Sequence, residues 1–437
     1  MNTTSQKSGS TFISLPVPET AANIINGMAL LLMPLSITSL PTLHGIVVLV
    51  LVVLGLLTMK AGLSRRYMVN RDEGQVLFVI VFMLATAIFV TVLSGFDDQA
   101  VNKIAKFSSL ILIVPIYFWF RASRPSATML WYGLLAGALV SLAVGVYEVT
   151  YDVYKPGYYG RAKGATHPII FGDLALLMGM MCVVGIGWFR ERAGWQVVLP
   201  VLALIAGVVA SVLSLSRGGW VAIPFFLIVI IWASRKRMSS RTQVLGVVAV
   251  SAILCAAYLI PQTGMQGKIA DTYNNINTYL SSDLQDPRRA TSIGARFEMW
   301  QASWQIFVDH PIVGVGWGQY QHYAQKLVDE GLRNPIAAQW VHPHNQFLSA
   351  LVSGGVLAGL AIILLFLIPL LVFLRHYRAA SNAADVRRYA LAGILLITVF
   401  AIFNLSESFL ERSRTVVFFV FYLAVYLACI RAESDQQ

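Results

Sequence analysis

Apolar runs of 16 to 29 residues, separated by short polar breaks, recur along nearly the whole chain. A helix rises about 1.5 Å per residue, so about 20 apolar residues cross the hydrocarbon core of a bilayer. Twelve segments come near that length and predict an all-α polytopic membrane protein with about twelve transmembrane helices. They lie at approximately 21–39, 44–59, 76–94, 104–120, 127–149, 168–189, 195–213, 218–234, 243–260, 346–374, 389–405 and 415–431.

Basic residues gather in alternate breaks between these runs. The positive-inside rule assigns such breaks to the cytoplasm, and no small-residue cleavage site follows the first run. We therefore expect an uncleaved first helix and both termini in the cytoplasm. The basic set comprises Lys60, Arg65, Arg66, Arg71, Arg121, Arg124, Arg190, Arg192, Arg235, Lys236, Arg237, Arg241, Arg375, Arg378, Arg387 and Arg388.

The one long break, 261–345, falls on the opposite, outer side and divides the chain into helices 1–9 (1–260), a loop subdomain (261–345), and helices 10–12 with a cytoplasmic tail (346–437). It is rich in aromatic residues, which disordered segments lack. A helical, amphipathic pattern runs from Arg296 to Val308 and ends before Pro311. We expect a helical cap on the bundle. Its aromatic side chains either stack on sugars or pack the cap onto the membrane surface.

Composition excludes a soluble protein, because 57% of the residues are hydrophobic and only 12% are charged. The net charge of +11 is explained by the cytoplasmic breaks, so we expect no nucleic-acid partner. All three cysteines, Cys182, Cys255 and Cys429, lie in apolar runs without ligand spacing to other Cys or His. Neither a disulfide framework nor a zinc site is indicated.

Two outer loops carry basic residues that orientation does not explain. Arg161 and Lys163 precede the sixth helix and could hold phosphate, although a basic loop at the membrane interface is an equal alternative. Arg217 lies in the tight Ser214–Trp220 turn between two apolar runs. A guanidinium at the membrane boundary is costly unless it is bound, and the alternative is that it snorkels to the interface.

Two further motifs frame the long loop. Arg296 opens the predicted cap helix against the macrodipole, which favours a ligand or carboxylate partner, with an ordinary salt bridge as the alternative. His342, His344 and Asn345 lie just before the tenth helix, where imidazole can exchange protons near neutral pH. A simple helix cap is the alternative. No carboxylate cluster accompanies the two histidines in the sequence, so we expect no metal there.

Taken together, these motifs resemble the O-antigen ligase and polymerase superfamily of bacterial envelope glycosyltransferases. The resemblance covers about 160–405 and includes the Ser-Arg-Gly turn, Arg296 followed by Trp300, the Pro311–Gly316 glycine motif, and His344-Asn345. Family members commonly carry Glu-x-Gly after the His-Asn pair, whereas this chain has Ser353-Gly354-Gly355. That departure puts in doubt an acidic role at this position.

The resemblance implies a GT-C-like enzyme of the bacterial inner membrane, with its active site facing the periplasm and no cofactor or metal. The implied donor is a glycan on undecaprenyl pyrophosphate, and the implied acceptor is a lipid A-core sugar. Arg217 and Arg296 match the arginines expected to bind pyrophosphate, and His344 matches the histidine at the reacting centre. We add Arg161, Lys163, His342, Asn345 and Trp300 as candidate substrate-binding residues.

Direct displacement would invert the anomeric centre, with arginine in place of a divalent ion at the leaving phosphate. His344 would then be the base or would orient the donor phosphate. An O-antigen polymerase and a protein O-oligosaccharyltransferase fit the same motifs. A transporter of lipid-linked glycans is disfavoured, because the predicted spans contain almost no charge. A metal-dependent transferase using Asp97 and Asp98 is the remaining alternative.

Overall fold

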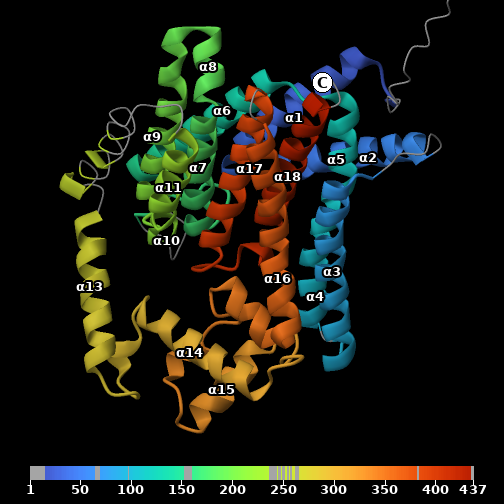
Figure 1. The fold of residues 1–437 in the computed structure, drawn as a ribbon. Helices are drawn as coiled ribbons and strands as arrows, with labels where there is room; N and C mark the ends of the chain where they lie inside the picture. Colours follow the sequence, from blue (N-terminus) through green and yellow to red (C-terminus); the bar gives the residue numbers. More distant parts are fainter. Residues whose placement is uncertain are drawn as a thin grey trace, which may run out of the picture.

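The computed structural model describes residues 15–63, 69–96, 98–151, 160–235, 265–380 and 383–434, together with isolated positions between 244 and 260. Throughout these residues the secondary structure is helical, without strands. Figure 1 shows a bundle of long helices with a smaller group of helices below it. The expected all-α polytopic fold is confirmed.

Ten helical segments in the described residues are long and apolar enough to cross a membrane, and the pair α7 and α8, bent by 52°, would make an eleventh. The predicted ninth span, 243–260, lies largely outside the described residues. The segments are α1 (Glu19–Ser39), α2 (Leu43–Leu63), α3 (Arg71–Ser94), α4 (Asp98–Ser108) continued by η1 (Ser109–Leu112) and α5 (Ile113–Ser123), α6 (Ala127–Thr150), α7 (Pro168–Val184) with α8 (Ile186–Arg192), η2 (Gly194–Val197) with α9 (Val198–Leu213), α10 (Arg217–Trp220) with α11 (Ala222–Ser234), α16 (Gln346–Ala379), α17 (Ala384–Phe403) and α18 (Ser413–Ser434).

The centre of the bundle is α18, which packs against α17 and α5. Its side chains are buried around nearly the whole circumference, and they include Phe418, Tyr422 and Tyr426, whose rings contact one another in tilted pairs. A helix that is apolar on every face belongs in such an interior position. By contrast, α3 exposes Phe78 and Phe89, which suits a helix that faces lipid.

α16 is broken about a quarter of the way along, at Gly354 and Gly355. The segment 311–316 enters this break: Val315 N–H donates to the Val352 carbonyl at 2.9 Å, and the next residue donates to the carbonyl that follows. Gly355 has φ +59°, and a Cβ there would lie 2.4 Å from the Ile312 backbone. The Ser353-Gly354-Gly355 sequence therefore makes room for the segment 311–316 to pack against the helix backbone. It carries no acidic side chain.

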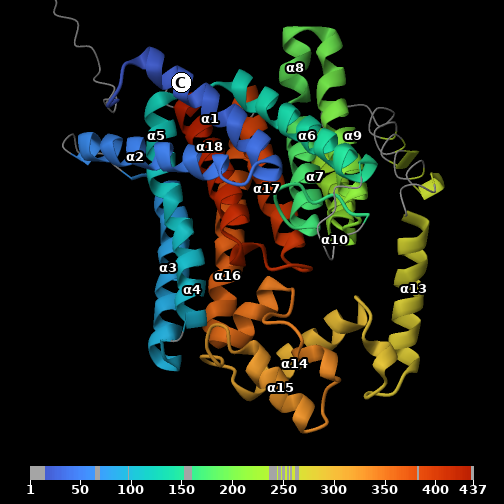
Figure 2. The ribbon, with the colours of Figure 1, turned by 180° about the vertical axis from the view of Figure 1, so that it is seen from behind.

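The helices outside the bundle come from the predicted loop subdomain, and we call residues 265–345 the cap. Seen from the front and from behind, it lies at one end of the bundle, with α13 standing apart on one side (Figures 1 and 2). Its elements are α13 (Met265–Ser281), η4 (Pro287–Arg289), α14 (Gly294–Asp309), α15 (Tyr320–Asp329) and η5 (Pro335–Ala338).

The predicted helix in the cap is present as α14, but its aromatic residues do not form the buried face. The helix buries small and aliphatic side chains, among them Met299, Ala302 and Ile306, against α15, η5 and α16. Trp304 remains 56% exposed. Small side chains allow close approach to the neighbouring helices, which leaves Trp304 on the outer face while Trp300 packs at the edge of the buried cluster.

Candidate functional site

His344 is held by a tightly fixed loop at the start of α16. Asn345 caps this helix, because its Oδ1 accepts hydrogen bonds from the N–H groups of Phe347 and Leu348 at 3.0 and 3.1 Å. Trp300 of the cap donates its indole N–H to the Pro343 carbonyl at 3.1 Å. His344 itself has φ +50°, a left-handed conformation that a non-glycine residue rarely adopts. The predicted cap helix and the helix start together position the imidazole.

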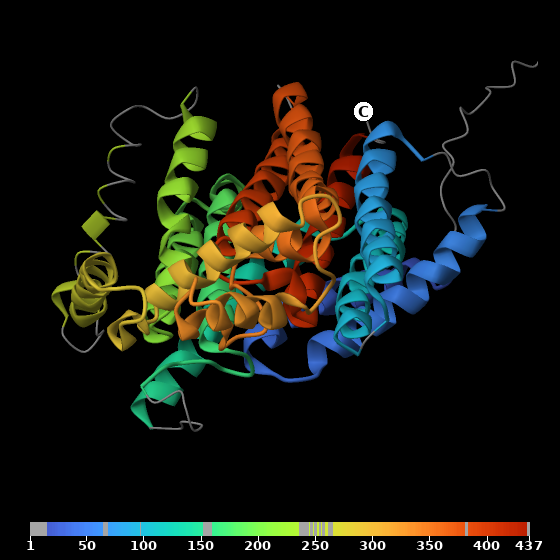
Figure 3. The same ribbon diagram turned by 90° about the horizontal axis from the view of Figure 1, so that it is seen from below.

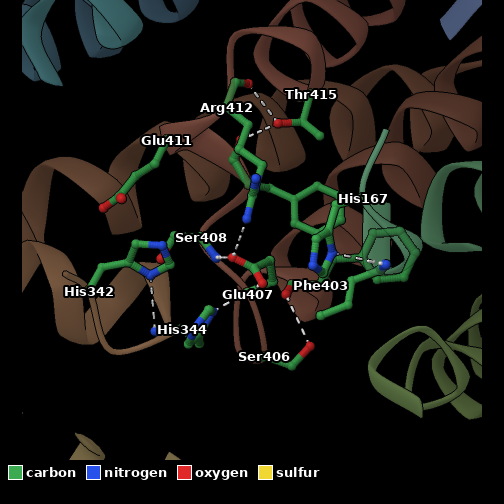
Figure 4. A network of polar contacts seen from close by, with 12 residues as sticks. His167, His342, His344, Phe403, Ser406, Glu407, Ser408, Glu411, Arg412 and Thr415 are labelled. Carbon is green, nitrogen blue, oxygen red and sulfur yellow. Dashed lines mark hydrogen bonds and ion pairs between the residues drawn. The ribbon is translucent and has the colours of Figure 1, made fainter. Parts of the chain in front are cut away.

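The partner of His344 is Glu407, from the loop between α17 and α18 (Figure 4). His344 Nδ1 lies 3.1 Å from Glu407 Oε2, and the carboxylate side chain is 1% exposed whereas the imidazole is 19% exposed. Burial alone would raise the pKa of Glu407. The hydrogen bond from His344 and the charges of His344 and Arg412 outweigh it, so this pKa lies well below its ordinary value.

The ionised carboxylate determines the tautomer of His344. A carboxylate can only accept hydrogen bonds, so the proton of the neutral imidazole is on Nδ1 and Nε2 keeps its lone pair. A backbone bond at 2.8 Å from Gln346 N–H to the Asn404 carbonyl ties the two loops together. The arrangement supplies a base whose orientation is fixed by a buried acid.

A second buried acid, Glu411, lies next to this pair. It forms an ion pair with Lys103 of α4 and accepts a hydrogen bond from Ser349 Oγ at 2.8 Å. Burial opposes ionisation, but the charges of Lys103 and His342 prevail and lower the pKa of Glu411 to about 2. His342 stacks edge-on with His344 at 4.5 Å between ring centroids, and burial lowers its pKa to about 4.

The two arginines expected to bind pyrophosphate meet at Ser292. Arg217 Nη2 donates to Ser292 Oγ at 2.9 Å, and Arg296 Nη1 donates to the carbonyl of the same residue at 3.2 Å. Arg217 also donates to the Lys268 carbonyl in α13 at 3.1 Å. Within the described chain neither arginine forms an ion pair, so the carboxylate partner considered for Arg296 is not found there.

Arg296 is electrostatically linked to the histidine site. Burial lowers its pKa, and the charge of Glu407 opposes this shift. Its Nε is buried without a hydrogen-bond partner in the described residues. A guanidinium remains protonated in proteins, so this group is a fixed positive charge with an unused donor.

Arg161 and Lys163 are held by their own surroundings. Arg161 Nε donates to the Ser214 carbonyl at 3.0 Å. Glu148, at the end of α6, accepts from the backbone N–H of Lys163 at 2.8 Å, and the lysine ammonium lies 3.4 Å from the Gly164 carbonyl. These contacts fasten the 160–167 loop to the bundle beside the turn that carries Arg217.

Sequence reasoning missed the acidic residues of the site. Glu407, Glu411 and the fully buried Asp173 of α7, which accepts from Ser216 Oγ at 3.4 Å, were not among the candidates. A short outer loop with acids four residues apart was the available signal for the first two. Asp173 is an ionisable side chain inside a span, a position that the sequence analysis did not single out.

The sequence has no carboxylate cluster beside the two histidines, but the fold brings the distant Glu407 next to them. Donor atoms of His342, His344 and Glu407 lie within 4.8 Å of one another, a spacing that could hold a metal ion. Of the acidic pair considered as an alternative metal site, Asp97 lies outside the described residues and Asp98 begins α4.

Fold and site together define a multi-pass helical membrane protein with a buried acid–histidine pair and two arginines at its capped end. Residues 201–363 match the family model described as O-Antigen ligase. A Haemophilus influenzae (strain ATCC 51907 / DSM 11121 / KW20 / Rd) protein described as uncharacterized is 22% identical over 358 residues, which cover 82% of this chain and 86% of that protein. The chain is therefore similar, over these residues, to the O-antigen ligase and polymerase superfamily.

This similarity supports glycosyltransferase-like chemistry of the O-antigen ligase or polymerase type in general. The substrates of such chemistry are, in general, a lipid-linked glycan and a lipid acceptor. The matched region contains Arg217, Arg296 and His344, but it ends before Glu407.

Proposed function

We propose that this protein is an O-antigen ligase, which transfers a glycan from undecaprenyl pyrophosphate to a sugar of lipid A-core on the periplasmic face of the bacterial inner membrane. The observation that carries the proposal is the hydrogen bond at 3.1 Å between His344 and the buried Glu407 carboxylate. This pair lies at the capped end of the bundle, where the charge of Glu407 also reaches Arg296. A base and fixed cations at one membrane boundary suit this transfer.

His344 is the proposed general base. With its Nδ1 proton held by Glu407, its Nε2 lone pair accepts the proton of the acceptor hydroxyl as the oxygen attacks the anomeric carbon. A positioned base of this kind contributes about 10² to 10⁴-fold to the rate. Glu407 is a positioning residue: its depressed pKa makes it a poor base, but it stabilises the imidazolium that forms.

Arg217 and Arg296 are the proposed ligands of the departing pyrophosphate. As the glycosyl–phosphate bond breaks, negative charge develops on the phosphate oxygens, and guanidinium groups neutralise it with charge-assisted hydrogen bonds. Both arginines are anchored to Ser292, which lies between α13 and α14. Direct attack opposite the leaving group inverts the anomeric configuration.

We propose that the reaction needs no metal ion. Arginines supply the positive charge at the leaving group, and Glu407 is already engaged by His344 and Arg412. Glu411, the other nearby carboxylate, is engaged by Lys103 and Ser349. Because the His342, His344 and Glu407 donor atoms could also hold an ion, metal dependence must be measured directly.

The test is transfer by purified protein in proteoliposomes that contain an undecaprenyl-pyrophosphate glycan and lipid A-core, with and without EDTA. We expect glycosylated lipid A-core in both conditions, and loss of about ten- to a hundredfold in rate for Arg217→Ala and for Arg296→Ala. Elongated lipid-linked glycan alone would identify a polymerase instead. Loss of transfer in EDTA, restored by a divalent ion, would overturn the metal-free mechanism.

A further inference from the structure

Lys106 of α4 lies near the Glu411 carboxylate, but that carboxylate is already ion-paired with Lys103. Lys106 is half-buried, and within the described residues it makes neither a hydrogen bond nor an ion pair. The charges that act on it come from two cations, Lys103 and Arg412, and from one carboxylate, Glu411. Placing an unpaired ammonium beside two other cations is costly, so this position favours an anionic ligand.

Arg412 presents a second set of unused donors at the same place. Its only ion pair in the described chain is with Glu407, at 3.5 Å, and that carboxylate is already bound to His344. The Arg412 side chain is 38% exposed. Figure 4 shows it extending toward Glu407 beside His167. Most of its guanidinium N–H groups are therefore available to a ligand.

The charge balance of this cluster is positive. Three cations, Lys103, Lys106 and Arg412, are grouped around two carboxylates, Glu407 and Glu411. Burial lowers the pKa of His342 and that of His167 to about 4, so both imidazoles are neutral at pH 7. One positive charge remains uncompensated.

The helix that carries Lys106 and the helix that Arg217 contacts lie on opposite sides of the molecule. α4 packs against η6 (Phe409–Glu411), next to Arg412. Arg217 contacts α13, which stands on the far side of the molecule from α4 in the front view and in the view from below (Figures 1 and 3). His344 and Glu407 are thus flanked by two separate groups of cations.

We propose that Lys106 and Arg412 bind a phosphate group of the acceptor glycolipid, and that this contact brings the acceptor hydroxyl to His344. The inference rests on the proposed function. Transfer needs two anionic lipids to approach one base from different sides, and one set of cations is already assigned to the donor. Arginine donates in a planar fork to phosphate and lysine adds a point charge, so the pair suits a phosphate ester.

The test compares acceptor and donor KM for wild type and Lys106→Gln in proteoliposomes, with lipid A-core before and after removal of its phosphate esters. We expect Lys106→Gln to raise acceptor KM about tenfold and to leave kcat and donor KM within about twofold. Wild type with the dephosphorylated acceptor should show the same raised KM. With that acceptor, Lys106→Gln should not raise the KM further. Arg412→Lys, which retains the charge, should have a smaller effect than Arg412→Gln.

The matched control is Lys326→Gln, which removes one positive charge from α15 of the cap and should leave both KM values unchanged. A rise in donor KM alone would assign the cluster to the donor and overturn the proposal. The proposal would also be overturned if the acceptor KM did not change when the acceptor phosphates were removed but changed with the phosphatidylglycerol content of the vesicles. The ligand would then be a bilayer headgroup. Unchanged KM values would also overturn it. If wild type transfers nothing to lipid A-core, the proposed function fails as well.

Discussion

Among single residues, Glu407 and Glu411 decide how the histidines of the site behave. Glu407 accepts the Nδ1 proton of His344, which leaves the other ring nitrogen free for the acceptor. Glu411 is bound by Lys103 and Ser349 and lies further from the imidazole. One carboxylate is therefore a partner of the base, and the other fastens α4 to the loop before α18.

The ion pair of Glu411 predicts a defined dependence of stability on pH. Its pKa in the folded protein is about 2, below the ordinary 4.5, so the unfolded chain binds the proton more readily. The stabilisation, up to about 3 kcal/mol, is present above about pH 4.5 and is lost as pH falls toward 2. The unfolding temperature of wild type should fall more between pH 5 and pH 3 than that of Glu411→Gln.

The exposed Glu330 provides the control for this prediction, and Glu330→Gln should follow the wild-type curve. Equal slopes for wild type and Glu411→Gln would show that the Lys103–Glu411 pair does not contribute. A steeper curve for Glu411→Gln would contradict the sign of the shift.

Among the elements, the broken helix α16 connects the cap to the bundle. His344 lies in the loop directly before its first turn. The segment 311–316, which follows α14, packs against its break. A change at the break would therefore be transmitted to the cap and to the loop that holds the base.

Gly355→Ala should destabilise the protein and reduce transfer. The new Cβ would meet the Ile312 backbone at 2.4 Å, and φ +59° is strained for alanine, so we expect a cost of about 1–3 kcal/mol. Thermal unfolding and initial transfer rates would measure both effects. Gly267→Ala is the matched control, since nothing lies within 4 Å of its added Cβ in α13. An unchanged unfolding temperature for Gly355→Ala would exclude a structural role for the break.

Spans and site differ in how far the sequence determines them. The apolar runs predicted eleven segments that the described structure contains, because length and hydropathy are local properties. The pairing of His344 with Glu407 joins residues 63 positions apart and depends on how α16, α17 and α18 pack. The outward aromatic face of α14 was likewise decided by packing, since periodicity alone does not say which face is covered.

For the whole molecule, the orientation in the membrane remains a prediction from charge. α8, which carries Arg190 and Arg192, lies at the end of the bundle away from the cap (Figure 1), so the positive-inside rule predicts that the cap faces the periplasm. In a background with the exposed Cys255 replaced by Ser, an impermeant maleimide added to cells with a permeabilised outer membrane should label Trp304→Cys. Arg190→Cys, in α8, should react only after lysis. The reverse pattern would contradict the assigned orientation.

A double-mutant cycle on His344 and Glu407 tests most directly whether a carboxylate-oriented histidine is the base. Rates of transfer to lipid A-core would be measured for wild type, Glu407→Gln, His344→Ala and the double variant, each checked for folding. We expect Glu407→Gln to lower kcat about a hundredfold in wild type and to change it little once His344 is absent. Independent losses that multiply in the double variant would contradict the account, because Glu407 would then act by some route other than His344.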